Sequence, residues 1–263
     1  MNVMPDKAID DTKLRRLMNS SFTHPPEAYR VESFGYSKIW FKWLPIISIP
    51  VLWWVSYWYP SFSEKWLVSE QTGLLEFINA LFPLLTALVA LRLLLFHQIR
   101  SDWFLVCWAF AMAVGGIYLA GEEASWGQHY IGWTTPEFWT SVNDQQETNL
   151  HNVSHWFDQK PRLILIVGII VTGIIQPWLH LNRPNLLWRR FDFIYPALAL
   201  VPLAGCVLFT LLISKVWAEA YSFLFRQLRS GELQELYIVW FLLAYSLSLY
   251  WRAKLIEGNS PTV

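Results

Sequence analysis

Residues 74–96 are LLEFINALFPLLTALVALRLLLF, and only Glu76 and Arg92 in this stretch carry a charge. A helix of about 20 apolar residues crosses the roughly 30 Å hydrocarbon core of a bilayer. A surface helix of a soluble protein would instead pair an apolar face with a polar one. The stretch therefore predicts a transmembrane helix and assigns the chain to the integral membrane proteins.

The composition of the chain supports this assignment. Hydrophobic residues make up 54% of the sequence and charged residues 15%, and there are 17 tryptophans. Tryptophan is enriched where an apolar ring meets the wet edge of a bilayer. The formal net charge is zero, which argues against nucleic acid as a partner. Cys107 and Cys206 lie in apolar runs, which favours small buried hydrophobes over a disulfide or a thiolate metal site.

Other apolar segments of similar length predict an all-α integral membrane protein, a six-helix transmembrane bundle. We expect an N-terminal cytoplasmic segment, a transmembrane domain that includes a polar external loop, and a short tail. The predicted spans are 39–59, 74–96, 103–121, 163–181, 193–213 and 236–252, and the three parts of the chain are 1–38, 39–255 with the loop at 122–160, and 256–263.

The distribution of Lys and Arg predicts the orientation of the bundle. Six spans place both termini on the same side, and that side receives most of the 20 Lys and Arg residues. Cytoplasmic loops carry the excess of these residues in membrane proteins. We therefore expect cytoplasmic termini, with the polar loop re-entrant or interfacial at the opposite face, toward the periplasm or the cell exterior.

Small residues in the third predicted span favour close helix packing. Ala111 and Gly115 are four residues apart, as are Gly116 and Ala120. This spacing places small side chains on one helix face, so that the backbone of a neighbouring helix can approach. We expect both pairs to pack against another span.

The polar loop gathers carboxylates and imidazoles in a chain of which only 15% is charged. At helical pitch Glu122, Ser125 and His129 share one face, and Glu123 points about 100° away. These residues come directly after the third predicted span, so we expect them at the membrane surface. They are the first half of a candidate site.

The second half of the loop has the pattern of a helix. Asp144 with Glu147 forms a capping box at the start of it. Glu147, His151 and His155 then follow at intervals of four residues, which places them on one face. Two imidazoles one turn apart can bind a single metal ion.

The residue types in the loop suggest a divalent metal site. Zinc and iron both accept mixed nitrogen and oxygen ligands. A bound metal ion would lower the pKa of a water molecule, and a nearby carboxylate would take its proton. The predicted metal ligands are His151, His155, Glu147 and His129, and the predicted catalytic or orienting residues are Glu122, Glu123, Asn149 and Asn152.

The same residues also fit a hydrogen-bonded structural plug, with Glu147 in its capping box and the histidines bonded to loop carbonyls. Conduction of ions or protons is disfavoured, since spans four to six contain almost nothing ionisable between their ends. Aromatic rings in the loop fit either the headgroup layer or an entry for a lipid. These aromatic residues are Trp126, Tyr130, Trp133, Phe138, Trp139 and Trp156.

Two elements of the loop, EEASWGQ from Glu122 and NDQQETNLHN from Asn143, resemble those of a family of uncharacterised bacterial multi-pass membrane proteins. That family carries EExSWGQ and NxQxExNLHN elements. The likeness covers about 35 residues, and beyond them it extends to a similar pattern of spans. It implies a bacterial inner-membrane protein and carries no assigned activity.

A weaker likeness is to the alkaline ceramidase superfamily of membrane-embedded zinc amidases. A Glu-Phe-x-Asn element, a Ser-x-x-x-His pair and a His-x-x-x-His pair occur there in this chain order. That superfamily differs in having seven spans, with the paired histidines in the last of them. The matching residues here are Glu76-Phe77-Ile78-Asn79, Ser125 with His129, and His151 with His155.

Two functions follow as hypotheses from these observations. The first is a metal-dependent hydrolase that acts on a lipid-linked or amphipathic substrate at the periplasmic face. The second is a non-enzymatic membrane subunit or assembly factor that uses the external loop to recognise another membrane protein. The sequence leaves open whether catalysis occurs.

Overall fold

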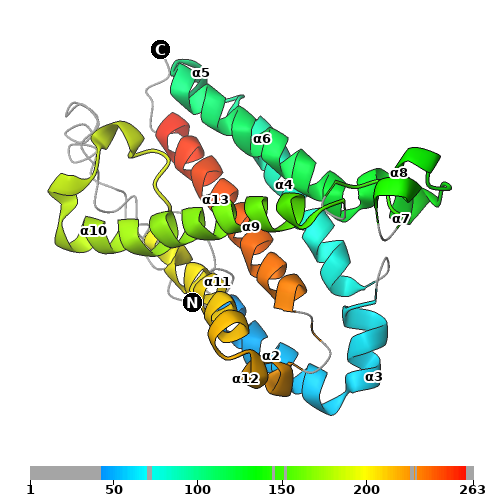
Figure 1. The fold of residues 1–263 in the computed structure, drawn as a ribbon. Coiled ribbons are helices and arrows are strands. Elements are labelled where there is room, and N and C mark those ends of the chain that lie inside the picture. Colours follow the sequence, from blue (N-terminus) through cyan, green and yellow to red (C-terminus); the bar gives the residue numbers. More distant parts are fainter. Residues whose placement is uncertain are drawn as a thin grey trace, which may run out of the picture.

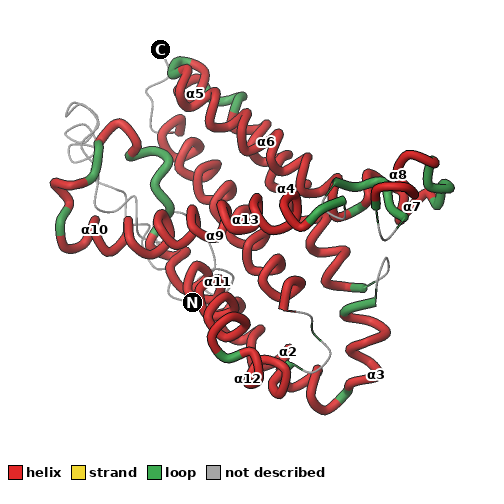
Figure 2. Tube along the Cα trace, in the orientation of Figure 1, coloured by secondary structure: helices red, strands yellow, loops and turns green. Residues whose placement is uncertain are grey.

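The computed structural model describes residues 43–69, 73–143, 146–150, 153–225, 228 and 230–258. The described part is helical and contains no strand (Figures 1 and 2). Five of its helices are long and apolar enough to cross a membrane, by length and composition. The protein is therefore a multi-pass membrane protein. The predicted segment 1–38 and residues 259–263 of the predicted tail lie outside the described residues.

The helices differ widely in length, and 3-10 or π-helical turns join several of them. The long ones are α4 (Leu74–Leu93), α6 (Trp103–Glu123), α11 (Val201–Val216), α13 (Ser230–Gly258), and a continuous run of α9 (His155–Ile170), a π-helical turn (Val171–Ile175) and α10 (Gln176–Asn182). The short ones are α2 (Leu44–Trp58), α3 (Pro60–Phe62), α5 (His97–Arg100), α7 (Gln128–Ile131), α8 (Glu137–Val142) and α12 (Ala218–Leu224). A π-helical turn covers Ser63–Leu67, and 3-10 turns cover Ser125–Gly127, Pro184–Leu186, Arg189–Phe191 and Leu198–Leu200.

Each of the predicted spans two to six overlaps one of the five long helices. The fifth begins later than the predicted residue 193, at a 3-10 turn that leads into α11. Proline accounts for this boundary. Pro196 disfavours a helical conformation at the residue before it, whereas Pro202 lies in the first turn of α11, where its missing N–H needs no partner.

The first predicted span corresponds to α2, which has 15 residues. At 1.5 Å per residue this helix is about 22 Å long, shorter than a hydrocarbon core of roughly 30 Å. Residues 39–42 of that span lie outside the described part of the chain. A sixth span therefore stays a prediction.

The central helix of the bundle is α13. In an apolar stretch of 18 residues of α13, 78% of the residues are buried, against 28% in the corresponding stretch of α6. It packs against α4, α11 and α9 (Figure 1). Tyr237 of α13 is fully buried, and its hydroxyl oxygen lies 2.7 Å from the Ser48 hydroxyl of α2. A hydroxyl buried in the bundle needs such a partner, so this contact also joins α2 to the centre.

The closest helix pair, α4 with α6, depends on a small residue. A Cβ atom at Gly116 would lie 2.6 Å from the Pro83 carbonyl oxygen of α4. Gly116 and Ala120 are both buried, which confirms the predicted packing of this pair. The predicted packing of Ala111 and Gly115 is wrong. Ala111 is exposed, and a Cβ at Gly115 would meet nothing within 4 Å. The two pairs lie on different faces of α6, and only one faces α4.

We expect Gly116→Val to destabilise the bundle by about 1–3 kcal/mol, because the added side chain must displace the α4 backbone. Gly115→Val is the matched control on the same turn, where the structure has room for the side chain. Unfolding of the purified protein in detergent, followed by circular dichroism, measures both variants. Equal loss of stability in the two variants would contradict this packing.

Candidate functional site

The polar segment, residues 124–150, begins with a sharp reversal at the end of α6. Three consecutive residues, Ser125, Trp126 and Gly127, have positive φ angles of 45°, 55° and 105°. Glycine adopts such angles at little cost, but serine and tryptophan do so only when the surrounding structure holds them. Strong local contacts must therefore stabilise this turn.

The Trp126 side chain supplies one of these contacts. Its indole ring lies so close over Gly121 that a Cβ there would be 2.8 Å from the ring. Its Nε1 donates a hydrogen bond of 2.9 Å to Glu122 Oε1. The ring thus folds back onto the last turn of α6 and fixes the direction in which the chain leaves the helix.

In the part that the structure describes, the predicted helix from Asp144 through His155 is not formed. Residues 146–150 are irregular, Gln146 has a φ of 56°, and α9 begins only at His155. The Glu147 carboxylate instead meets side chains from residues 125–129, so tertiary hydrogen bonds replace the local helical ones. The predicted helical face of Glu147, His151 and His155 is therefore wrong.

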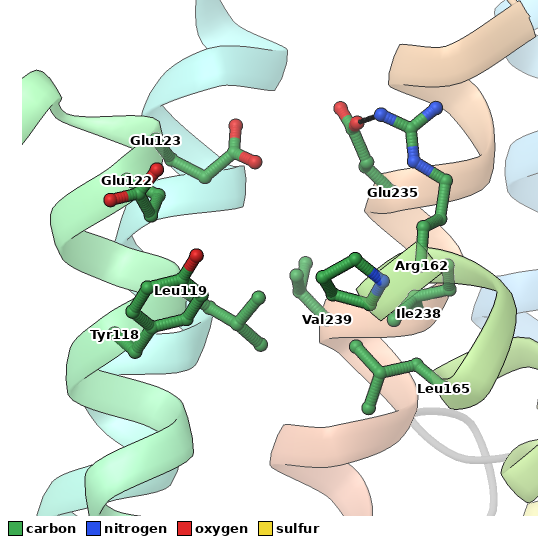
Figure 3. Close-up of a pocket in the computed structure, with 10 residues that line it drawn as sticks. Tyr118, Leu119, Glu122, Glu123, Arg162, Leu165, Glu235, Ile238 and Val239 are labelled. Atoms are coloured by element: carbon green, nitrogen blue, oxygen red, sulfur yellow. Dashed lines mark hydrogen bonds and ion pairs between the residues drawn. The ribbon is translucent and has the colours of Figure 1, made fainter. Parts of the chain in front are cut away.

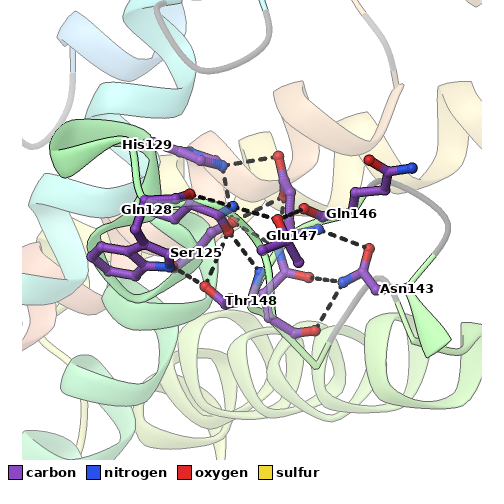
Figure 4. A network of polar contacts seen from close by, with 10 residues as sticks. Ser125, Gln128, His129, Asn143, Gln146, Glu147 and Thr148 are labelled. Atoms are coloured by element: carbon purple, nitrogen blue, oxygen red, sulfur yellow. Dashed lines mark hydrogen bonds and ion pairs between the residues drawn. The ribbon is translucent and has the colours of Figure 1, made fainter. Parts of the chain in front are cut away.

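Glu147 is the centre of a hydrogen-bonded network (Figure 4). Its carboxylate accepts hydrogen bonds from Ser125 Oγ at 2.9 Å and Asn149 Nδ2 at 2.8 Å, and its Oε1 lies 2.9 Å from His129 Nε2. Asn149 Nδ2 also donates to Ser125 Oγ, at 2.9 Å. Ser125 and Asn149 are both 0% exposed. A buried carboxylate is costly unless it is bonded in this way.

Further hydrogen bonds extend the network along both halves of the segment (Figure 4). The Thr148 N–H donates to Gln128 Oε1, and the Thr148 hydroxyl donates to the Ser125 carbonyl, each at 2.8 Å. Asn143 Nδ2 donates to Asn149 Oδ1 at 2.9 Å. Residues 125–129 and 143–149 are thereby joined side by side.

The two adjacent glutamates at the end of α6 have different surroundings. Glu122 is 4% exposed, and its Oε2 accepts a 2.7 Å hydrogen bond from the Leu150 N–H. Both glutamates line a cleft, and Glu123 points across it toward Arg162 of α9 (Figure 3). Glu122 thus fastens the end of the polar segment to α6, while Glu123 faces the cleft.

Hydrogen bonding to Glu147 raises the pKa of His129 above its ordinary value of 6.5; burial opposes this shift and the negative charge of Glu76 adds to it. Burial raises the pKa of the Glu147 carboxyl. Hydrogen bonds from His129, Ser125 and Asn149 outweigh that effect and lower the pKa below its ordinary 4.5. At a pH between the lowered pKa of Glu147 and the raised pKa of His129, Glu147 is a carboxylate that faces a protonated imidazole.

The grouping of serine, histidine and glutamate differs from a hydrolytic triad. In a triad the serine bonds to one imidazole nitrogen and the carboxylate to the other, so that the imidazole can take the serine proton. Here Ser125 Oγ and Glu147 Oε1 both lie 2.9 Å from the same nitrogen, His129 Nε2. Ser125 is also fully buried. The arrangement therefore lacks the relay of a triad from serine through imidazole to carboxylate.

His129 and Glu147, the two predicted metal ligands whose side chains the structure describes, contact each other directly. His151 and Asn152 lie outside the described residues, as does the side chain of His155. Among the side chains that the structure does describe, no three histidines, cysteines or carboxylates form a metal-binding group. The zinc or iron site therefore stays a prediction.

Several members of the network were not predicted individually. Gln128, Asn143 and Thr148 bond across the segment, although only their place in the EEASWGQ and NDQQETNLHN elements marked them in advance. Arg162 and Glu235 were missed altogether. The sequence feature that could have revealed them is a charged residue in the first turns of an apolar helix. A charged residue within a span indicates a functional or paired group.

We expect Glu147→Gln to lower the pKa of His129, because burial of the imidazole then dominates. The His129 contribution to stability is present below pH 6.5 and is lost as the pH rises through its raised folded pKa. The Glu147 contribution is present above pH 4.5 and is lost as the pH falls through its lowered folded pKa. The variant should be less stable than the wild type by about 1–3 kcal/mol. The difference in stability should be largest between pH 4.5 and pH 6.5.

Histidine-selective NMR titration measures the pKa, with the His129 signal assigned by its absence in His129→Asn. Unfolding in detergent from pH 4 to 8 measures stability. Glu137→Gln, at an exposed carboxylate of α8, is the control and should behave as the wild type. A difference in stability that is constant across this pH range would contradict the ionised pair.

Comparison with protein-family models, with curated proteins and with solved structures finds no match to this chain. The resemblance based on the EExSWGQ and NxQxExNLHN elements therefore stays a prediction, as does the likeness to the ceramidase superfamily. The geometry of the polar segment and its surroundings carries the functional argument.

Proposed function

We propose that this chain is a non-enzymatic membrane subunit or assembly factor of a bacterial inner membrane. In this proposal both termini are cytoplasmic, and the polar segment lies at the periplasmic face as a rigid surface that recognises another membrane protein. The observation that carries the proposal is that the network joins polar groups to one another inside the segment, while several large aromatic and apolar side chains are exposed on it.

The polar groups in the middle of the segment are hydrogen-bonded to one another. Glu147 accepts hydrogen bonds from Ser125 and Asn149, and the latter two are fully buried. A substrate would have to break these bonds before it reached either group, at a cost of about 1–3 kcal/mol for each polar group left without a partner. The arrangement favours a structural role for the network.

The outside of the segment carries several large apolar side chains among polar ones. Its large exposed side chains come from the reversal after α6, from α7 and from α8, and these elements lie together at one end of the α4 and α6 pair (Figure 1). Aromatic side chains and exposed apolar patches are typical of recognition surfaces. The exposed residues are Trp126, Tyr130, Ile131, Trp133 and Phe138.

The rigidity of the segment favours a protein partner over lipid alone. Lipid is fluid, so rings that only anchor to the headgroup layer need no fixed arrangement. Here three non-glycine residues of the segment, Ser125, Trp126 and Gln146, are held at positive φ. Strained backbone is kept where its geometry is used, and preorganisation of a surface lowers the entropy that binding costs.

Site-specific photo-crosslinking in intact cells tests the proposal. A photoreactive amino acid replaces Ile131 or Phe138, which are 76% and 67% exposed, and Ile164 of α9, 70% exposed, is the control within a predicted span. We expect one adduct of defined mass at the two positions in the segment and none at the control. Glu147→Gln should reduce that adduct, because it loosens the segment that presents the rings.

Two results would overturn the proposal. One is cross-linking to lipid alone at all three positions. The other is about one metal ion per purified chain that is lost in a His151→Ala/His155→Ala double variant, since this would support the metal-dependent hydrolase inferred from the sequence. Elemental analysis of the wild type beside the double variant therefore distinguishes the two functions.

A further inference from the structure

The end of the bundle opposite the polar segment is formed by the end of α4, by α5, by the start of α6 and by the end of α13 (Figure 1). Hydrogen bonds join these elements to one another and to the stretch that precedes α11. Gln98 Nε2 of α5 donates to the Ala253 carbonyl of α13 at 2.6 Å. Arg190 donates to both carboxylate oxygens of Asp102 at the start of α6, at 2.7 and 2.8 Å. The helices at this end therefore have fixed positions relative to one another.

Positive charge exceeds negative charge at this end, among the side chains that the structure describes. Asp102 is neutralised by Arg190, with which it forms an ion pair. Arg92, Arg100 and Lys254 are exposed, and none of them forms an ion pair with another described residue. This end therefore presents cations that a ligand can reach. The cations are Arg92, Arg100, Arg190, Arg252 and Lys254, and the carboxylates are Asp102, Asp192 and Glu257.

Arg92 continues an exposed apolar face of α4. Leu84, Leu88 and Arg92 follow at intervals of four residues, so they lie on one face of the helix. Leu84 is 44% exposed and Leu88 50% exposed, and Arg92 is exposed in the last turn. An exposed face within a membrane span contacts lipid. The face therefore changes from apolar to cationic toward the end of the helix, in the order in which a phospholipid changes from acyl chain to head group.

The short helix α5 holds Arg100 beyond the end of α4. Ile99 is 1% exposed, and the buried ring of Phe96 packs edge-on against Tyr250 of α13 with 5.4 Å between the ring centroids. These inward contacts leave Arg100 on the outside. Trp103 at the start of α6 is 73% exposed, and tryptophan is enriched in the head-group layer of a bilayer. The Arg100 side chain therefore lies close along the chain to a marker of that layer.

The charge at this end favours a lipid of net negative charge. A single arginine near a helix end often only extends to water. Here two exposed arginines and a lysine lie on one rigid frame, and near a membrane surface each such residue attracts an anionic lipid by roughly a factor of five. Guanidinium groups also donate hydrogen bonds to phosphate oxygens in pairs. A zwitterionic lipid carries a cation of its own, which the excess of positive charge repels.

We propose that this end of the bundle binds an anionic phospholipid, with its phosphate at Arg92 and Arg100 and an acyl chain along Leu88 and Leu84. The two guanidinium groups donate hydrogen bonds to the phosphate oxygens, and Lys254 adds to the positive field. Charge complementarity at the head and the apolar face of α4 together specify the ligand class. A free phosphate ion would use only the first of these.

Native mass spectrometry of the full chain tests this site. Delipidated protein in detergent is given equimolar phosphatidylglycerol, phosphatidylethanolamine and phosphatidylcholine. We expect the wild type to retain phosphatidylglycerol about twentyfold over each of the other two, since each arginine contributes roughly a factor of five. Arg92→Gln/Arg100→Gln should retain the three lipids about equally. Lys65→Gln/Lys160→Gln, at two exposed lysines of the opposite end, removes the same charge and should keep the preference.

A single variant keeps the test decisive if the arginine double variant does not fold. Arg100→Gln changes only an exposed residue of α5, leaves the spans unaltered, and should reduce the preference to about fivefold. Inorganic phosphate, equimolar with the lipids, should leave the phosphatidylglycerol adduct unchanged.

Three results would overturn the proposal. They are equal retention of the three lipids by the wild type, equal loss of preference in the arginine and lysine double variants, and displacement of the lipid by equimolar phosphate. The second would show that net charge alone decides retention, and the third that the site takes a free anion. None of these results would affect the photo-crosslinking at Ile131 and Phe138, so this proposal and the proposed function fail separately.

Discussion

The partly buried carboxylate of Glu147 is the constraint on which the polar end of this protein depends. An ionised carboxylate out of water must be surrounded by donors, and here Ser125, His129 and Asn149 provide them. Ser125 can do so only in a strained backbone conformation, which turns the chain back at the end of α6. One electrostatic requirement thus explains the strained turn, the absence of a helix at 146–150 and the rigidity of the whole segment.

The helical bundle decides where this network is placed. The central helix, α13, is packed against α4, and α4 is held closely against α6 because Gly116 leaves room for the Pro83 carbonyl. The end of α6 therefore has a fixed position relative to the starts of α9 and α13. The same placement that supports the polar segment also forms the cleft of Glu123 and Arg162. Two different surfaces, one aromatic and one charged, result at one end of the bundle.

The part of the site that was predicted correctly is the part that depends on local sequence. Ser125 and His129 are four residues apart and do meet, although a strained turn lies between them. Glu147 does meet His129, but its predicted neighbours on a helix were wrong, because Ser125 and His129 lie about 20 residues earlier. Helical periodicity describes hydrogen bonds between near neighbours, and it contains no information on a carboxylate that bonds to a distant part of the chain.

The sequence by itself determined that this is an all-helical multi-pass membrane protein, because long apolar runs have few alternatives in a bilayer, where each backbone polar group must be bonded within its own helix. It also determined which forty residues are distinctive. Only the tertiary structure decided that Glu122 fastens the polar segment while its neighbour Glu123 faces a cleft with Arg162. These two residues are adjacent in the chain, and their different roles come from the helices packed on either side of them.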